Sequence, residues 1–463
     1  MSDTSMSDTG ASTASVQPRP EVRAPGEWNF PQPRELVLPN GIRALVHDVP
    51  GQYVISVRAT VPVALRHEPR EIEGVAWIMA RLLDEGTRTH SQRELSELLE
   101  RRGVAIGAGM SEAALGVDMD VPQRNLEEAL ALLTECLSEP VFAETEVARL
   151  TRTRLAEIEQ ERASAGRRAL KEWAKTYYDA SSRASRPGSG TPDTVAAITR
   201  QAVVDFHAEH VHPEGATVVV AGDLTGVDVD ALLAGSLGAW TTSGRTASVE
   251  PAPAPRAADA ARVVLVDRPG SVQSEILIGS PGPDRRVDSG WAPFPILGYV
   301  IGGAPNARID EVLREDKGYT YGIRAGFRPR QIGSAFTVSG SVRADSTVDS
   351  LRLLTQILGE VGTGLTEQET RAGVDFMTLT APGRYDTADA IADETSGLAG
   401  DNLPLTFTSD VIAAMRELTP ADLDAAWREH VSQERTIIVV GDAQLYRDEV
   451  ESLGLGPVTV VPN

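Results

Sequence analysis

The chain has 463 residues, with 66 acidic side chains against 44 Lys and Arg, so its formal net charge is −22. This charge argues against nucleic acid and against an anionic membrane surface as partners. The single cysteine, Cys136, excludes an intrachain disulfide, and the leucines around it predict a buried thiol on a helix. The length is too great for one ordinary hydrophobic core and predicts roughly three units of ~150 residues, or two larger ones.

The first residues are rich in Ser, Thr, Asp and Pro, and they contain neither a basic segment nor an apolar run. We therefore expect a disordered tail over residues 1–28, without a signal peptide or a transmembrane helix. A cytoplasmic protein is the corresponding expectation.

The ordered part is predicted to begin with a β-hairpin over residues 35–46, because Asn40-Gly41 is typical of a tight hairpin turn. A third strand is expected over residues 54–63, and an amphipathic helix follows at 74–87. In that helix we expect Trp77 to be buried together with its apolar neighbours, which are Ile78 and Leu82.

Further helices and one strand follow in alternation. A Ser-x-x-Glu capping box at residue 91 opens a helix that Gly103 ends, and residues 115–121 alternate as a half-buried strand. Helices are then predicted over residues 126–138, 144–163 and 167–178.

The sequence contains an internal duplication. A helix end, a turn and a β-branched strand that stops at Gly-Asp occur over residues 206–223 and again over 427–442. The Pro- and Ala-rich segment 246–261 predicts a linker between two homologous halves, 29–245 and 262–463. The predicted fold class is α+β, with an antiparallel sheet layered with helices in each half.

Three histidines, His207, His210 and His212, form a His-x-x-His pattern with a third ring nearby, which is compatible with a metal site. The duplicated segment has a histidine only at position 430, and His212 precedes a proline in a predicted turn. An independent metalloenzyme that uses these rings is therefore kept as one alternative, beside a structural role for them.

Residues 74–87 resemble the opening helix of the pitrilysin/insulinase (M16) zinc peptidases, whose motif is Gly-x-x-His-x-x-Glu-His followed by Gly-Thr. In this chain the two histidine positions hold Trp77 and Arg81, and the glutamate position holds Ala80. The motif works because residues four apart share one helix face, where two imidazoles hold zinc and the glutamate reaches its water. Indole, methyl and guanidinium groups do neither, so this chain is expected to bind no metal.

The resemblance places a third zinc ligand of the family at Glu157, on the helix predicted over residues 144–163. One carboxylate without its two imidazoles binds zinc poorly. We therefore expect Glu157 to be solvated or salt-bridged.

Residues 301–322 resemble the signature of the second domain in the same family: a Gly-rich loop, a helix, and a Gly-x-x-Tyr entering a strand. The resemblance places the family's arginine/tyrosine pair at Arg314 and Tyr321, and the substrate path beside Gly302 and Gly303. A phenol can donate to the oxygen of a tetrahedral intermediate, and a guanidinium can hold a substrate carbonyl. The alternative is that Arg314 caps a helix and Tyr321 is a strand aromatic.

The resemblance implies half of a clam-like peptidase chamber, in which this chain is the non-zinc-binding subunit of a heterodimer. The expected partner is a homologous subunit that carries His-x-x-Glu-His and binds the zinc, and the expected substrate is a peptide that pairs with a sheet edge. The competing expectation is a catalytically inert structural or peptide-binding subunit of the same fold.

Overall fold

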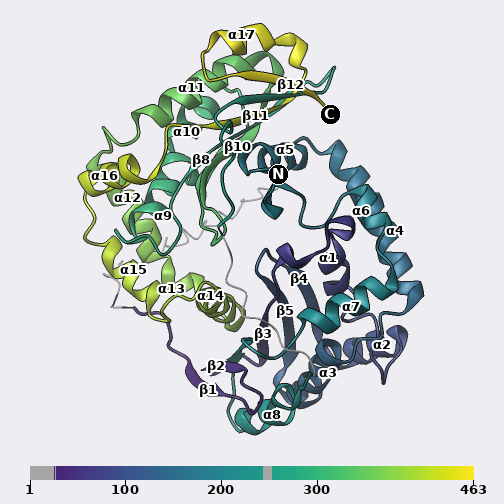
Figure 1. The fold of residues 1–463 in the computed structure, drawn as a ribbon. Coiled ribbons are helices and arrows are strands. Elements are labelled where there is room, and N and C mark those ends of the chain that lie inside the picture. The colour runs from purple at the N-terminus through teal and green to yellow at the C-terminus, as the bar shows by residue number, and fades with distance from the viewer. Residues whose placement is uncertain (1–25, 27, 243–252) are drawn as a thin grey trace, which may run out of the picture.

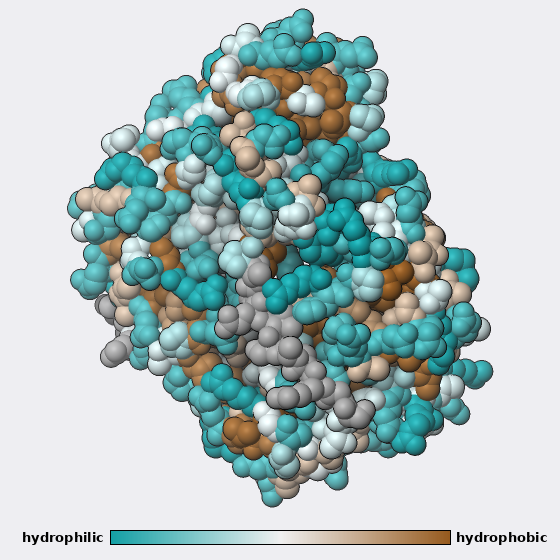
Figure 2. All heavy atoms as spheres, viewed as in Figure 1, coloured by the Kyte–Doolittle hydropathy of each residue, from teal (hydrophilic) through white to brown (hydrophobic). Residues whose placement is uncertain are grey.

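The computed structural model describes residues 26, 28–242 and 253–463. Most of the predicted tail and residues 246–252 of the predicted linker lie outside this range, so both remain predictions. No helix in the described ranges is long and apolar enough to cross a membrane. The face drawn in Figure 2 is mostly hydrophilic, with apolar side chains in separate groups.

The first half is built on a six-stranded sheet in the order β1-β2-β6-β3-β5-β4. Its strands are β1 (Arg34–Val37), β2 (Arg43–Asp48), β3 (Val54–Pro62), β4 (Ala105–Met110), β5 (Ala114–Pro122) and β6 (Thr217–Gly222). Its helices are α1 (Val75–Ala80), α2 (Gln92–Arg102), α3 (Leu126–Ser138), α4 (Glu144–Ala163), α5 (Ala165–Tyr177), α6 (Pro192–Ala196), α7 (Arg200–His210) and α8 (Val229–Gly235).

The second half has a six-stranded sheet in the order β12-β7-β11-β8-β10-β9. Its strands are β7 (Val263–Asp267), β8 (Gln273–Pro281), β9 (Arg324–Arg328), β10 (Ala335–Arg343), β11 (Thr436–Gly441) and β12 (Val458–Pro462). Its helices are α9 (Pro293–Gly298), the π-helical turn η6 (Tyr299–Gly303), α10 (Arg308–Asp310), the π-helical turn η7 (Glu311–Asp316), α11 (Thr347–Glu360), α12 (Glu367–Leu379), α13 (Ala381–Arg384), α14 (Ala388–Gly400), α15 (Phe407–Met415), α16 (Pro420–His430) and α17 (Arg447–Ser452). Short 3₁₀ turns complete both halves.

The two sheets have the same strand order apart from one edge strand, as the duplication predicts. Strands β2, β6, β3, β5 and β4 correspond in order to β7, β11, β8, β10 and β9. The sheets are predominantly antiparallel, but β2 pairs with β6 in parallel, and β7 pairs in parallel with both β11 and β12. The parallel pairs arise because nearly all helices of a half lie between these strands in sequence, as crossover connections require.

Each half places one helix on the sheet of the other half (Figure 1). In β6, Val218 and Val220 face the core of their own half, whereas Val219 and Ala221 face α14 of the second half. Helix α5 of the first half packs in return on the second sheet, where Trp173 belongs to one buried apolar cluster with residues of β7, β8 and β11. Because neighbouring strand residues point to opposite faces, the central strands β6 and β11 are buried on both faces.

Several local predictions are confirmed. The hairpin β1–β2 is antiparallel, the capping box at Ser91 is formed with Glu94, and Gly103 ends α2 in the left-handed conformation. Cys136 is buried on α3, and this burial raises the pKa of its thiol to about 12. A thiol with so high a pKa is chemically inert at neutral pH.

Candidate functional site

The entry into α1 is fixed by a glycine and a buried carboxylate. Gly74 has φ of 103°, a left-handed conformation that favours glycine, and a Cβ there would meet the backbone of Gly190 at 3.0 Å. The Glu68 carboxylate accepts from the backbone N–H of Gly74 at 2.9 Å and of Ala76 at 3.0 Å. It also pairs with Arg183 at 2.6 Å, which connects α1 to the loop over residues 181–190.

Trp77 lies at the edge of the core, close to two guanidinium groups. Ile78 and Leu82 are fully buried as predicted, whereas Trp77 is only partly buried and packs against the core, so the expectation for Trp77 is met in part. The guanidinium carbon of Arg81 is 4.7 Å from the centre of the indole ring, and that of Arg154 is 5.2 Å away. Cation–π attraction to tryptophan explains why the ring stays at this partly open position.

Arg154 on α4 is the centre of this cluster, and its side chain is only 3% exposed. It donates to Glu157 at 3.2 Å and to both carboxylate oxygens of Glu161 at 2.8 and 3.1 Å. It also donates to the carbonyl of Ser189 at 3.2 Å. Burial disfavours its charge, but these carboxylates more than compensate and raise the pKa of Arg154. The group is therefore a permanent buried cation.

Glu157 also lies 3.7 Å from Arg81, which confirms that it is salt-bridged. The structure thus brings together Trp77, Arg81 and Glu157, three positions at which the zinc peptidases carry ligands. Two of them are not metal ligands, and the third is held by two guanidiniums. These residues do not fit a zinc ion, since Arg81 and Arg154 already supply the positive charge that neutralises Glu157.

The three histidines do not converge on one point. His207 Nε2 bonds to the carbonyl of Leu137 at 2.9 Å, and both ring nitrogens of His212 are bonded, one to Thr242 and one to the carbonyl of Glu209. The ring of His210 lies 5.3 Å from that of His67. Burial lowers the pKa of His207 to about 4, so this imidazole stays neutral. These contacts favour the structural role over the metalloenzyme alternative.

In the second half, the predicted glycine loop is helical. Gly302 and Gly303 form the end of the π-helical turn η6, which follows α9 without a break. Gly302 is buried, and a Cβ there would lie 2.7 Å from the backbone nitrogen of Ala325 on β9. A glycine at this position lets η6 pack directly on β9, while Gly303 is exposed.

Arg314 and Tyr321 are both at the surface of this half. Arg314 lies in η7 with a side chain 43% exposed, and its Nε is 3.4 Å from the carboxylate of Glu315. Tyr321 is 94% exposed on the turn between η7 and β9. Figure 1 shows that α10, which leads directly into η7, and α1 lie in different halves, so the pair is not brought to the Trp77 cluster.

The turn that carries Tyr321 is held firmly in place. Thr320 donates its hydroxyl to the carbonyl of Ser341 at 2.7 Å, and the fully buried Asp310 accepts from the N–H of Ile323 at 2.9 Å. Asp310 also pairs with Arg324 at 2.7 Å. The sequence analysis missed Asp310. The sequence feature that could have identified Asp310 is an acidic residue directly after the apolar Ile309, on the helical side that faces the core.

Comparisons with known proteins agree with this architecture. Residues 44–187 match the family model for insulinase (peptidase family M16), and residues 197–375 match that for the peptidase M16 inactive domain. An uncharacterized zinc protease of Streptomyces coelicolor is 25% identical over 452 residues, which cover 95% of this chain and 96% of that protein.

Among solved structures, a peptidase M16 inactive domain from Pseudomonas fluorescens superposes with a TM-score of 0.81 at 21% identity, covering 88% of this chain and 98% of that one. A chain of complex III2 from Candida albicans gives a TM-score of 0.73 at 13% identity, covering 90% and 99%. The two family models together span most of the sequence, and this chain belongs to the M16 (insulinase) peptidase family.

Proposed function

We propose that this chain is the non-zinc-binding subunit of a two-chain M16 peptidase. Its partner is a homologous subunit that carries His-x-x-Glu-His and holds the zinc, and the two enclose a peptide substrate between them. The cluster around Arg154 supports the first part of this proposal, because a guanidinium stands where a catalytic subunit would need ligands for a cation.

The exposure of Tyr321 is the observation that carries the proposal. An aromatic side chain that is 94% exposed contributes little to the stability of its own subunit. The turn that carries it is nevertheless fixed by the hydrogen bonds of Thr320 and Asp310. A rigid support under a freely accessible phenol is the arrangement expected of a group that acts on a ligand from outside.

In this proposal the Tyr321 hydroxyl donates to the oxygen of the tetrahedral intermediate in the partner's active site, where negative charge develops. The Arg314 guanidinium holds a backbone carbonyl of the substrate near the cleaved bond. Gly303, the exposed member of the glycine pair, lines the substrate path, and Gly302 supports it by packing on β9.

The second candidate is an inert structural subunit. It is favoured by the likeness to a chain of complex III2, and by the loss of all three chemical positions of the zinc motif in α1. This candidate assigns no role to Arg314 and Tyr321, so the two candidates predict different effects of substitutions there.

The test is to mix the purified chain with a homologous subunit that carries the zinc motif and to measure cleavage of a peptide. We expect Tyr321→Phe to lower the turnover of the mixture on the order of 100-fold, the usual effect of removing one oxyanion donor. Tyr53→Phe is the matched control, since Tyr53 is also a well-exposed tyrosine and lies beside β3 of the other half. Equal turnover of the Tyr321 variant and the original mixture would establish the structural candidate.

A further inference from the structure

The two halves meet at a cleft of about 480 Å³, which we name the junction cleft. It is lined by the end of α4, one face of α5, the loop over residues 184–190 and the end of β12. Arg330, in the loop between β9 and β10, lines it from the second half and pairs there with Glu112 of the first half. A volume of this size lies within the roughly 300–1,000 Å³ range of ligand pockets.

The lining side chains are more often basic than acidic, in a protein whose net charge is −22. Seven cationic side chains line the junction cleft against three acidic side chains. Two of the cations pair with carboxylates outside the lining, Arg162 with Glu159 and Arg186 with Glu73. Helix α5 and the end of α4 supply five of the cations: Arg162, Arg167, Arg168, Lys171 and Lys175. So local an excess in a concave site raises the concentration of anions there.

The acidic residues of the junction cleft are already engaged, and several of them are shared between two cations. Glu172 pairs with Arg168 at 2.8 Å and lies 3.5 Å from Lys175. Glu161 is held by the buried Arg154, and Arg167 reaches it only at 3.4 Å. Within the described ranges Lys171 has no ion pair, and its pKa is lowered by burial and by neighbouring guanidiniums.

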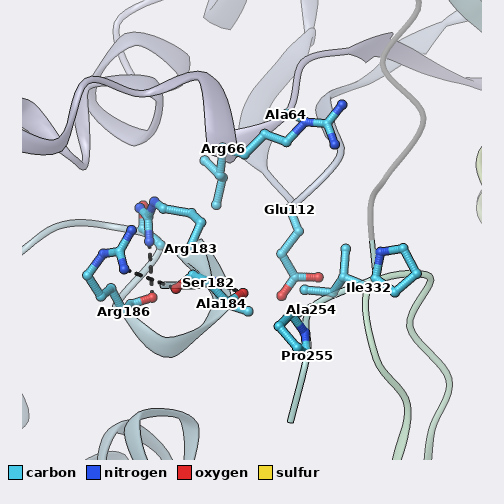
Figure 3. A pocket seen from close by; sticks show the side chains of 13 residues that line it. Ala64, Arg66, Glu112, Ser182, Arg183, Ala184, Arg186, Ala254, Pro255 and Ile332 are labelled. Carbon is cyan, nitrogen blue, oxygen red and sulfur yellow. Dashed lines mark hydrogen bonds between the residues drawn. The ribbon is translucent and has the colours of Figure 1, made fainter. Parts of the chain in front are cut away.

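The junction cleft also offers apolar and peptide-like surroundings. Leu170 lines it with 43% of its surface exposed, next to Lys171. Arg168 donates to the backbone carbonyl of Pro462 at 3.1 Å, so a peptide backbone already lies against this guanidinium. The junction cleft adjoins a second cavity of about 260 Å³, with which it shares Glu112 and Arg186 (Figure 3).

We propose that the junction cleft is a binding site for a carboxylate-bearing peptide segment, with Lys171 and Arg167 as its principal contacts and Leu170 as an apolar contact. The size and the apolar wall favour a peptide over an inorganic anion. The carboxylate comes either from acidic side chains or from the C-terminus of the peptide. The inference deepens the proposed function, because it names acidic peptides as the class held beside the chamber, but binding itself requires no zinc-bearing partner.

The test measures binding of a fluorescent peptide to the purified full-length chain by anisotropy. Four peptides of one length are compared: one with internal glutamates and a free C-terminus, its Glu→Gln counterpart, and the C-terminally amidated form of each. We expect the amidated Glu→Gln peptide, which carries neither carboxylate, to bind at least roughly tenfold more weakly than the peptide with both. A loss of this size corresponds to one charge-assisted hydrogen bond. The two singly neutralised peptides identify which carboxylate is recognised.

The variant K171Q/R167Q should lose the same affinity, while R93Q/R371Q is the matched control. Arg93 and Arg371 are highly exposed arginines on helices outside the junction cleft, each paired with an acid four residues away. The proposal is overturned if all four peptides bind alike, if both double variants behave alike, or if millimolar phosphate displaces the peptide as well as the unlabelled peptide does. If the peptide binds in the junction cleft but the Tyr321→Phe mixture cleaves as fast as the original mixture, the proposed function is refuted and this site stands.

Discussion

The guanidinium of Arg81 lies 3.7 Å from the carboxylate of Glu157, across the gap between α1 and α4. Residue 81 is the second histidine position of the zinc motif, and Glu157 occupies the position of the third ligand. The backbone N–H of Arg81 donates to the carbonyl of Trp77 at 3.3 Å, so residues 77 and 81 are one helical turn apart. The residues that the resemblance places at the three ligand positions are therefore still adjacent.

This relationship predicts that zinc binding can be rebuilt. We expect the variant W77H/A80E/R81H to bind one zinc ion per chain, because two imidazoles on one helix face would meet the carboxylate of Glu157. Elemental analysis and titration calorimetry measure this binding. Adding E157Q to the triple variant is the control, and it should weaken zinc binding at least tenfold. If the triple variant, folded by circular dichroism, binds no zinc, the prediction is wrong: either Arg154, which the variant retains 3.2 Å from Glu157, excludes the ion, or the three positions no longer converge.

The main frame of the fold could be predicted from local patterns. The Asn40-Gly41 turn, the capping box at Ser91 and the repeated Gly-Asp strand ends are each set by a few neighbouring residues, and all occur as expected. The reciprocal packing of α5 and α14 was not predictable in this way. Each of these helices buries its apolar face on strands of the other half, and periodicity shows that a face is buried but not against which sheet.

The candidate site was predictable only in part, for a similar reason. Arg154 is one of many charged residues on α4, and nothing local distinguishes it from the exposed Arg162 on the same helix. Its burial depends on the loop carbonyl of Ser189 and on the ring of Trp77, which lie far away in sequence. The partial exposure of Trp77 has a related origin: Arg81 is its neighbour one turn along α1, but Arg154 comes from α4.

The contact between the halves should be sensitive to acid through His47. This imidazole is 3% exposed, and its Nε2 bonds to the hydroxyl of Thr395 on α14 at 2.9 Å. Burial lowers the pKa of His47 to about 4, below its ordinary value of 6.5. Its neutral form therefore stabilises the fold above pH 6.5, and this contribution is lost progressively as the pH falls toward 4.

At pH 5 the expected loss from His47 alone is about 2 kcal/mol of the free energy of unfolding relative to pH 7. Urea denaturation at both pH values measures it. The glutamine of H47Q does not titrate. In this variant the difference in the free energy of unfolding between pH 7 and pH 5 should therefore shrink by that amount, even if the substitution lowers the stability at pH 7. An unchanged pH difference in the variant would show that His47 is not the sensitive group.

The docking of α5 on the second sheet depends on a glycine of β8. A Cβ at Gly279 would lie 2.2 Å from Nε1 of Trp173 and 2.7 Å from the adjacent ring carbon, so the indole has to move if any side chain is added. Trp173 is buried and stacks on Tyr177 with ring centres 4.4 Å apart, which leaves it little room. We expect Gly279→Ala to lower the free energy of unfolding by about 1–3 kcal/mol, the usual cost of overpacking.

Gly326→Ala is the matched control, because Gly326 lies in β9 of the same sheet with no atom within 4 Å of its added Cβ. Urea denaturation of both variants gives the stabilities, and a shift of tryptophan fluorescence in the first variant alone would locate the change at Trp173. Equal stabilities would mean that α5 is not seated on β8 in solution, and the junction cleft, which α5 lines, would then have a different shape.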